Sequence, residues 1–143
     1  MKVIYFFIRW LHALRYKITL IGEEHLHHEG PILLLANHVA LIDPRIVLSQ
    51  IGKYRSLSPL ASEKYYNIPW IKQVMQAVGT IPIADASAQS IVPDFSLVYK
   101  NIIQWLNEGK AILIYPSGQI YRQGYESIKG KQSVYQILKE LPE

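Results

Sequence analysis

A strand, a polar turn and a helix start follow one another early in the chain, and this unit restricts the fold more than any other feature. Residues 32–36 are an apolar run typical of a buried strand. Asn37 and His38 follow directly, and we expect Asp43 to cap a helix that Pro44 opens, because both residue types favour the start of a helix. A strand that leads through a short turn into a helix is the repeating unit of α/β proteins.

His38 and Asp43 make this turn a candidate catalytic site. A histidine at the carboxyl end of a buried strand faces the crevice in which open α/β sheets bind ligands. A neutral imidazole held by a carboxylate takes a proton from a hydroxyl, and the carboxylate stabilises the imidazolium that forms. Neither step requires a metal. The alternative for the Asn-His pair is an ordinary hydrogen-bonded turn without a catalytic role.

Helix and strand patterns alternate along the whole chain. This alternation predicts a single α/β domain with a largely parallel central sheet flanked by helices. We expect strands at 19–21, 32–36, 55–60, 79–83 and 111–114, and helices at 3–16, 44–50, 69–77, 94–108 and 129–141.

A second unusual turn follows a later apolar strand. Tyr115-Pro116-Ser117-Gly118-Gln119 comes directly after residues 111–114, and a short strand pattern at 79–83 stands between the two turns. The order and spacing of these three blocks resemble the glycerolipid, or lysophospholipid, acyltransferase family, which includes 1-acyl-glycerol-3-phosphate acyltransferase. The resemblance extends from about residue 18 to the C-terminus.

The resemblance implies both a fold and a reaction. The family's first block, Asn-His-x4-Asp, is complete here as Asn37, His38 and Asp43. It implies a glycerol-3-phosphate acyltransferase-like fold in which His38 is the general base and Asp43 orients it. A fatty acyl group would move from acyl-CoA or acyl carrier protein to a hydroxyl of a lysophospholipid or related lipid, with no metal or organic cofactor. Our candidate substrate-binding residues are Asn37, Ser117, Gly118 and Arg122.

Two of the three blocks depart from the family pattern. The second commonly ends in Arg, but Asp85 stands there. The third commonly is Phe-Pro-Glu-Gly-Thr-Arg, whereas here Ser117 replaces the Glu and Gln119-Ile120 replaces the Thr-Arg pair. Because an arginine that would bind phosphate bidentately is lost, a phosphate acceptor is disfavoured relative to an uncharged or zwitterionic one. Arg122 compensates for this loss or is simply a solvated loop cation.

The first 17 residues predict an amphipathic helix with a wide apolar face. Such a face, rich in aromatic residues, suits a helix that lies in a membrane interface, although core packing explains it as well and both can hold at once. The uninterrupted apolar run covers only residues 3–8, far short of the roughly 20 that a spanning helix needs. The polar positions form one narrow stripe of Lys2, Tyr5, Arg9, His12 and Tyr16.

Composition excludes several functional classes. The chain has no Cys, so disulfides, thiolate metal sites and cysteine nucleophiles are excluded. Its 15 Lys and Arg exceed its 11 Asp and Glu, and the net charge of +4 suits an anionic surface. The basic residues are scattered without a nucleic-acid-binding signature, which favours a membrane surface over nucleic acid. We therefore expect a peripheral, membrane-associated protein on the cytoplasmic face.

The predicted organisation is an amphipathic helix at 1–17 followed by an acyltransferase domain at 18–143. The resemblance implies further sheet and a fourth, proline-containing block beyond this range, so we expect the N-terminal portion of the domain. One alternative, a non-catalytic membrane-binding fragment, is favoured by Asp85, by Ser117 and by this early end. Another, an esterase with Ser117 as nucleophile, is disfavoured because Tyr115 stands where a Gly-x-Ser-x-Gly elbow has its first glycine.

Overall fold

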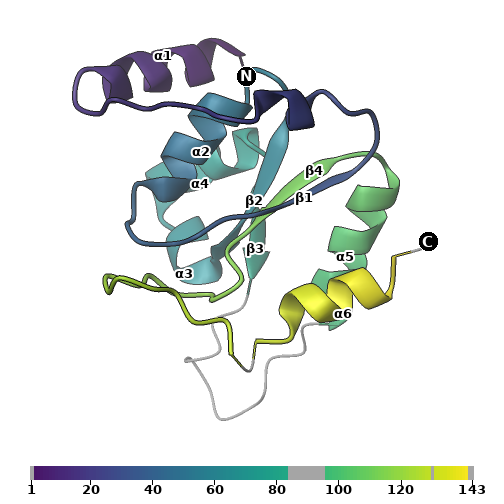
Figure 1. Ribbon diagram of the computed structural model, residues 1–143. Helices are drawn as coiled ribbons and strands as arrows, with labels where there is room; N and C mark the ends of the chain where they lie inside the picture. Colours follow the sequence, from purple (N-terminus) through teal and green to yellow (C-terminus); the bar gives the residue numbers. More distant parts are fainter. Residues whose placement is uncertain (1, 84–95, 130, 142–143) are drawn as a thin grey trace.

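Four parallel strands form the centre of the molecule (Figure 1). The computed structural model describes residues 2–83, 96–129 and 131–141. The strand order is β1-β4-β2-β3, and each neighbouring pair is parallel. This arrangement confirms the predicted α/β class with a parallel central sheet. The strands are β1 (Ile32–Leu35), β2 (Leu57–Ser62), β3 (Ile81–Ile83) and β4 (Ala111–Ile114).

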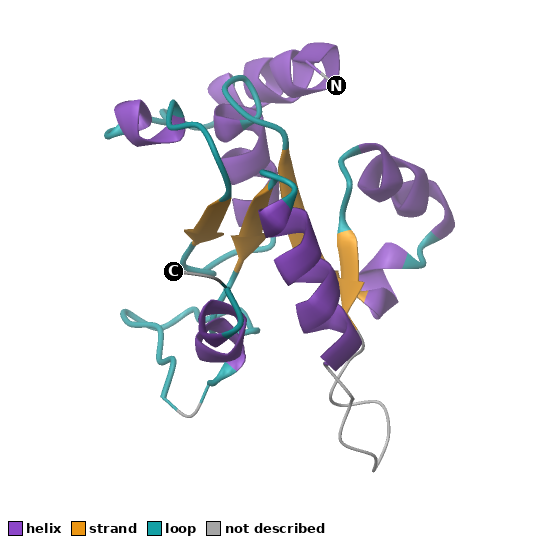
Figure 2. Ribbon diagram, turned by 90° about the vertical axis from the view of Figure 1, so that its right-hand side faces the viewer, coloured by secondary structure: helices purple, strands orange, loops and turns teal. Residues whose placement is uncertain are grey.

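Helices make every crossover that the parallel strands require. Helix α2 connects β1 to β2, α3 and α4 connect β2 to β3, and α5 connects β3 to β4. Figure 2 shows α5 running across the face of the sheet opposite to α2. The helices are α1 (Lys2–Ala13), α2 (Asp43–Ile51), α3 (Glu63–Tyr66), α4 (Pro69–Ala77), α5 (Ser96–Asn107) and α6 (Ser133–Lys139), with a 3-10 turn at Glu23–Leu26.

Strand β4 contributes to the core on both faces of the sheet. Ala111 and Leu113 pack on the side that α1 and α2 cover, whereas Ile112 and Ile114 pack against α5 and α6. All four side chains are buried, as is typical of a parallel strand with helices on both sides. The apolar run predicted for this strand therefore matches its position in the middle of the sheet.

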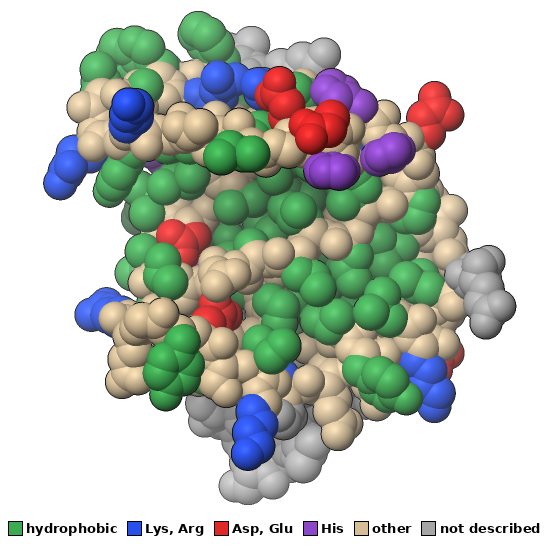
Figure 3. Space-filling view, in the orientation of Figure 1, with side chains coloured by type: hydrophobic (Ala, Val, Ile, Leu, Met, Phe, Trp, Pro, Cys, Tyr) green, Lys and Arg blue, Asp and Glu red, His purple; other side chains and the backbone are tan. Residues whose placement is uncertain are grey.

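Helix α1 packs on α2 through part of its polar stripe, while its apolar side faces outward. Tyr5 is 3% exposed and His12 is 8% exposed, and the His12 Nδ1 atom lies 3.4 Å from Ser49 Oγ. Gly52 permits this close approach, because a Cβ there would lie 2.6 Å from the Tyr5 ring. Figure 3 shows hydrophobic side chains gathered over α1 at the upper left, and the exposed ones include Phe6, Phe7, Trp10, Leu11 and Leu14.

Several expectations about the elements differ from the structure. Residues 19–21 form no strand, and Ile21 is 88% exposed, because no neighbouring strand offers them hydrogen-bond partners in the described sheet. The last helix is shorter than expected and covers Ser133–Lys139. The expected cap at Asp94 lies outside the described residues.

The buried centre of β4 makes a direct test of this packing. Ile112→Ala should lower the free energy of unfolding by about 2–5 kcal/mol, because it leaves a cavity in a core that is completely shielded from water. The same substitution at exposed Ile21 should change it by less than about 0.5 kcal/mol. Urea denaturation measures both, and an equally small effect at the two positions would contradict the placement of β4.

Candidate active site

The carboxyl ends of β1 and β4 bring the two unusual turns together. The two strands pair in register from Ile32 with Ala111 to Leu35 with Ile114, and the Ala36 N–H then donates to the Ile114 carbonyl at 3.0 Å. The segments that follow therefore leave the same edge of the sheet side by side. As a result the ring of His38 stacks on that of Tyr115, with centroids 4.3 Å apart and planes 30° apart.

Asp43 organises the turn that carries His38. Its Oδ2 atom accepts hydrogen bonds from the N–H groups of Val39 (2.7 Å) and Ala40 (2.8 Å) and lies 3.3 Å from His38 Nδ1. The expectation that Asp43 caps the helix is wrong: α2 begins at Asp43, Ile42 occupies the cap position, and the carboxylate points back to the turn. Two backbone donors in the turn hold it there, so one oxygen is fixed beside the imidazole.

The segment after β4 holds the backbone of His38. The His38 N–H donates to Glu126 Oε2 at 2.7 Å, and the His38 carbonyl accepts from the Tyr121 N–H at 2.8 Å. Glu126 is a residue of the site that the sequence analysis missed. It is 88 positions from His38 and belongs to no recognised motif, and the only available signal was an acidic residue within the loop that follows the third block.

Ser117 and Gly118 form a tight turn beside His38. Ser117 is fully buried and its hydroxyl donates to the Gln119 carbonyl at 3.0 Å. Gly118 has φ +66°, a left-handed conformation that favours glycine, and its N–H donates to the Tyr115 carbonyl at 2.9 Å. A hydroxyl that is buried and bound within its own turn is not presented to a substrate, so nothing in the geometry supports Ser117 as an esterase nucleophile.

Asn37 and Arg122 flank these contacts at the surface. Asn37 immediately precedes His38, and Arg122 follows Tyr121, whose N–H binds the His38 carbonyl. Both side chains are exposed, and Arg122 has no ion pair within the described ranges. The structure thus brings every predicted site residue to one edge of the sheet. Asp85, the departure in the second block, lies outside the described residues.

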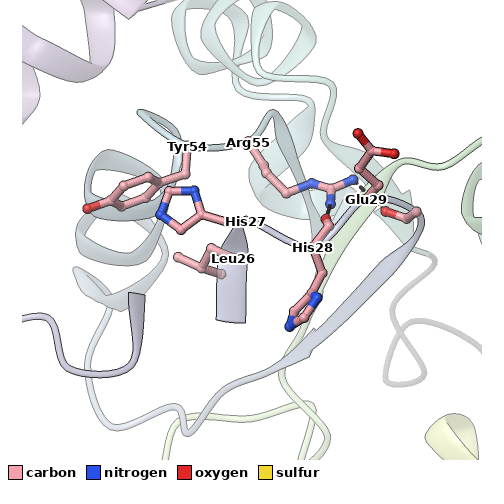
Figure 4. Close-up of a pocket in the computed structure, with 7 residues that line it drawn as sticks. Leu26, His27, His28, Glu29, Tyr54 and Arg55 are labelled. Carbon is pink, nitrogen blue, oxygen red and sulfur yellow. Dashed lines mark hydrogen bonds between the residues drawn. The ribbon is translucent and has the colours of Figure 1, made fainter. Parts of the chain in front are cut away.

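A pocket at the opposite end of the sheet is separate from this site (Figure 4). Its central residue is Arg55, whose guanidinium donates to the carbonyls of His28, Gly30 and Gly109. These hydrogen bonds join the loops that precede β1, β2 and β4, which indicates a structural role. In the part of the chain that the structure describes, no three His, Asp or Glu side chains converge in a way that would hold a metal ion.

Burial of Tyr115 gives the floor of the site an unusual electrostatic character. Desolvation, followed by the negative charge of Asp43, raises the pKa of the Tyr115 phenol well above its ordinary value. Its hydroxyl is buried without a hydrogen-bond partner among the described residues. The imidazole of His38 therefore stacks on a phenol whose raised pKa keeps it protonated to a higher pH than usual.

Tyr115→Phe should remove this unpaired hydroxyl without loss of packing. At pH 7 we expect unchanged stability or a gain of up to about 1 kcal/mol, because an unpaired buried hydroxyl destabilises the native state. Because the pKa of Tyr115 is raised in the native protein, the unfolded chain loses the phenol proton at a lower pH than the native protein does. The stability of the parent is therefore unaffected by ionisation of this group below about pH 10 and decreases as the pH rises further.

Urea unfolding at neutral and alkaline pH measures the effect. The Phe variant should lose less stability than the parent above about pH 10, whereas Tyr125→Phe, at an exposed position, should follow the parent. If the free energy of unfolding depended on pH in the same way in all three proteins, the Tyr115 phenol would not be shielded from water.

The chain is similar to known proteins in both sequence and structure. Residues 17–142 match the sequence model of the family described as Acyltransferase. A 1-acyl-sn-glycerol-3-phosphate acyltransferase of Borreliella burgdorferi is 27% identical over 133 residues, a match that covers 91% of this chain and 49% of that protein. The crystal structure of the 1-acyl-sn-glycerophosphate (LPA) acyltransferase PlsC from Thermotoga maritima superposes with a TM-score of 0.72 at 19% identity, covering 96% of this chain and 52% of that one.

These similarities differ in what they establish. The chain spans about half the length of both proteins, and at 19% identity the structural similarity shows the shared fold alone. The family match is different in kind, because it extends over nearly the whole chain and includes both turns of the site. The chain therefore belongs to the acyltransferase family.

Proposed function

We propose that the chain carries the reaction centre of a glycerolipid acyltransferase. In this reaction a fatty acyl group moves from an acyl thioester, acyl-CoA or acyl carrier protein, to a hydroxyl of a lysophospholipid or related lipid, with His38 as general base. The observation that carries the proposal is the 3.3 Å approach of Asp43 Oδ2 to His38 Nδ1 at the carboxyl edge of the sheet. Membership of the acyltransferase family supports it.

The position of Asp43 decides which nitrogen of His38 acts. A proton on Nδ1 is placed to donate to the Asp43 carboxylate, and Nε2 then keeps the lone pair that accepts the proton of the lipid hydroxyl. The freed oxygen attacks the thioester carbonyl carbon, a C–O bond forms, and the C–S bond breaks. The thiolate that leaves takes the proton from His38 Nε2, so the base is restored. Asp43 orients the imidazole and stabilises its charged form during this cycle.

The turn beside His38 has room for a substrate but offers few free donors. A Cβ at Gly118 would meet no atom within 4 Å, so this side of the turn is open. The Gly118 N–H is already bound to the Tyr115 carbonyl, and the Ser117 hydroxyl to that of Gln119. Ser117 and Gly118 therefore contribute the shape of the acceptor pocket rather than a ready pair of oxyanion donors.

The acceptor is proposed to be a lysophospholipid whose head group does not depend on an arginine clamp. Gln119 and Ile120 occupy the positions where the resemblance places Thr and Arg, and both lack a cationic group. Arg122 is the exposed cation nearest in sequence to the His38 contacts and is the candidate for a head-group contact. The B. burgdorferi relative is named for 1-acyl-sn-glycerol-3-phosphate, which makes that lipid the natural comparison.

Membrane association is proposed through the outward face of α1. Phe6 on this face is 72% exposed, while the stripe residues Tyr5 and His12 face the protein. Aromatic and aliphatic side chains on one helix face are suited to the boundary between head groups and acyl chains. A peripheral position at the cytoplasmic face would bring the base to lipid substrates. Among the helices that the structure describes, none is long and apolar enough to cross a bilayer.

Acyl transfer by the parent and by His38→Ala tests the proposed function. Radiolabelled acyl-CoA and acyl carrier protein are offered with lysophosphatidic acid, lysophosphatidylethanolamine and monoacylglycerol in liposomes. We expect transfer by the parent, with a preference for an acceptor other than lysophosphatidic acid. His38→Ala should reduce it by about a hundredfold or more, because a positioned general base contributes about that much.

His25→Ala is the matched control, because the His25 side chain is exposed and belongs to another loop. It should transfer at the parent rate. Transfer that persists in His38→Ala would refute the mechanism. No transfer by any of the three proteins, despite intact folding and liposome binding, would favour the non-catalytic, membrane-binding alternative.

A further inference from the structure

We propose that Glu126 is a positioning residue for His38, and that its carboxylate holds the backbone of the base in the orientation that the reaction needs. The inference rests on the proposed function, since it concerns the same base. It is carried by a contact that joins distant parts of the chain: the His38 N–H donates to Glu126 Oε2 at 2.7 Å across 88 positions.

Regular pairing of β1 with β4 ends at Leu35 and Ile114, and this explains why the backbone of His38 needs another partner. Beyond Leu35 the backbone still has one paired side, as the bond from the Ala36 N–H to the Ile114 carbonyl shows. At His38 the segment after β4 binds both backbone groups: the Tyr121 N–H donates to the His38 carbonyl, and the Glu126 carboxylate accepts from the His38 N–H. The carboxylate oxygen thus takes the place of the carbonyl that β4 would offer if its pairing with β1 continued.

The geometry of these contacts fixes the imidazole as well as the backbone. Hydrogen bonds to an ionised acceptor are shorter and about twice as strong as those between neutral groups. With the His38 N–H and carbonyl both bound, the peptide planes on either side of His38 have little freedom to rotate. The ring then has a defined position between its stacking contact on Tyr115 and its polar contact with Asp43.

The second oxygen of Glu126 argues against a role in stability alone. Oε1 is buried and has no hydrogen-bond donor among the residues that the structure describes. A buried carboxylate oxygen without a donor is unfavourable, and this penalty offsets much of what the bond to His38 contributes to folding. The bond to the backbone of the base is therefore better explained by its effect on the base than by its contribution to folding.

Three substitutions test the proposal in the full chain. Glu126→Ala removes the acceptor, Glu126→Gln keeps an oxygen acceptor of the same shape without the charge, and Glu140→Ala removes an exposed carboxylate on a neighbouring segment as control. Each variant is assayed for kcat and KM with the best acceptor lipid. Urea unfolding and the ¹H–¹⁵N signal of the His38 amide are recorded for the same samples.

We expect Glu126→Ala to lower kcat roughly tenfold to a hundredfold with little change in KM, because a small displacement of a catalytic group has effects of this size. Glu126→Gln should restore kcat to within about fivefold of the parent, since the weaker neutral acceptor still holds the amide. The His38 amide proton should shift upfield in Glu126→Ala. The stability of all variants should stay close to that of the parent, and Glu140→Ala should resemble the parent throughout.

Opposite results would overturn the proposal. A kcat and a His38 amide signal unchanged in Glu126→Ala would show that the contact does not position the base. Lost stability with unchanged kcat per folded molecule would show that Glu126 is purely structural. Acyl transfer that persists in His38→Ala would instead refute the proposed function itself.

Discussion

The parallel pairing of β1 with β4 is the interaction on which the candidate site depends. It joins two segments that are about 80 positions apart and sets them in a register in which Leu35 lies opposite Ile114. Every contact of His38 with Tyr115 and with Glu126 requires that the two strands end at the same level. The burial of β4 between two layers of helices is what makes this pairing rigid, because its alternate side chains anchor both halves of the core.

At this edge, two carboxylates replace regular secondary structure as partners of the backbone. Asp43 accepts from the amides of Val39 and Ala40, and Glu126 accepts from that of His38, so three consecutive N–H groups end on side chains. The helix macrodipole adds to this arrangement, since Asp43 is at the positive end of α2. These side-chain acceptors hold the backbone of the turn in the position that the proposed role of His38 as a base requires.

The parts of the fold that could be predicted from sequence are those with local causes. The apolar run of β4 and the Pro69 start of α4 were predicted with their observed bounds, because burial on both faces and a fixed proline φ leave clear signals. The His38–Asp43 pair could also be predicted, because both residues belong to one turn. The strand expected at 19–21 was wrong because these residues pair with no strand of the described sheet, which a local apolar pattern does not reveal.

Two features could not be predicted because they depend on distant partners. Glu126 carries no local signal, and only the folded chain brings it to His38. The inward side of α1 is partly polar because the Tyr5 ring packs against Gly52 and the His12 imidazole lies beside the Ser49 hydroxyl. A pattern of hydrophobic residues in the sequence does not reveal these contacts.

The most direct test of the account is the tautomer of His38, observed by long-range ¹H–¹⁵N NMR of the imidazole at neutral pH. The account predicts a neutral ring with its proton on Nδ1, facing Asp43, and an unprotonated Nε2. A ring protonated on Nε2, in either the neutral or the cationic form, would leave no lone pair for a lipid hydroxyl and would contradict the account.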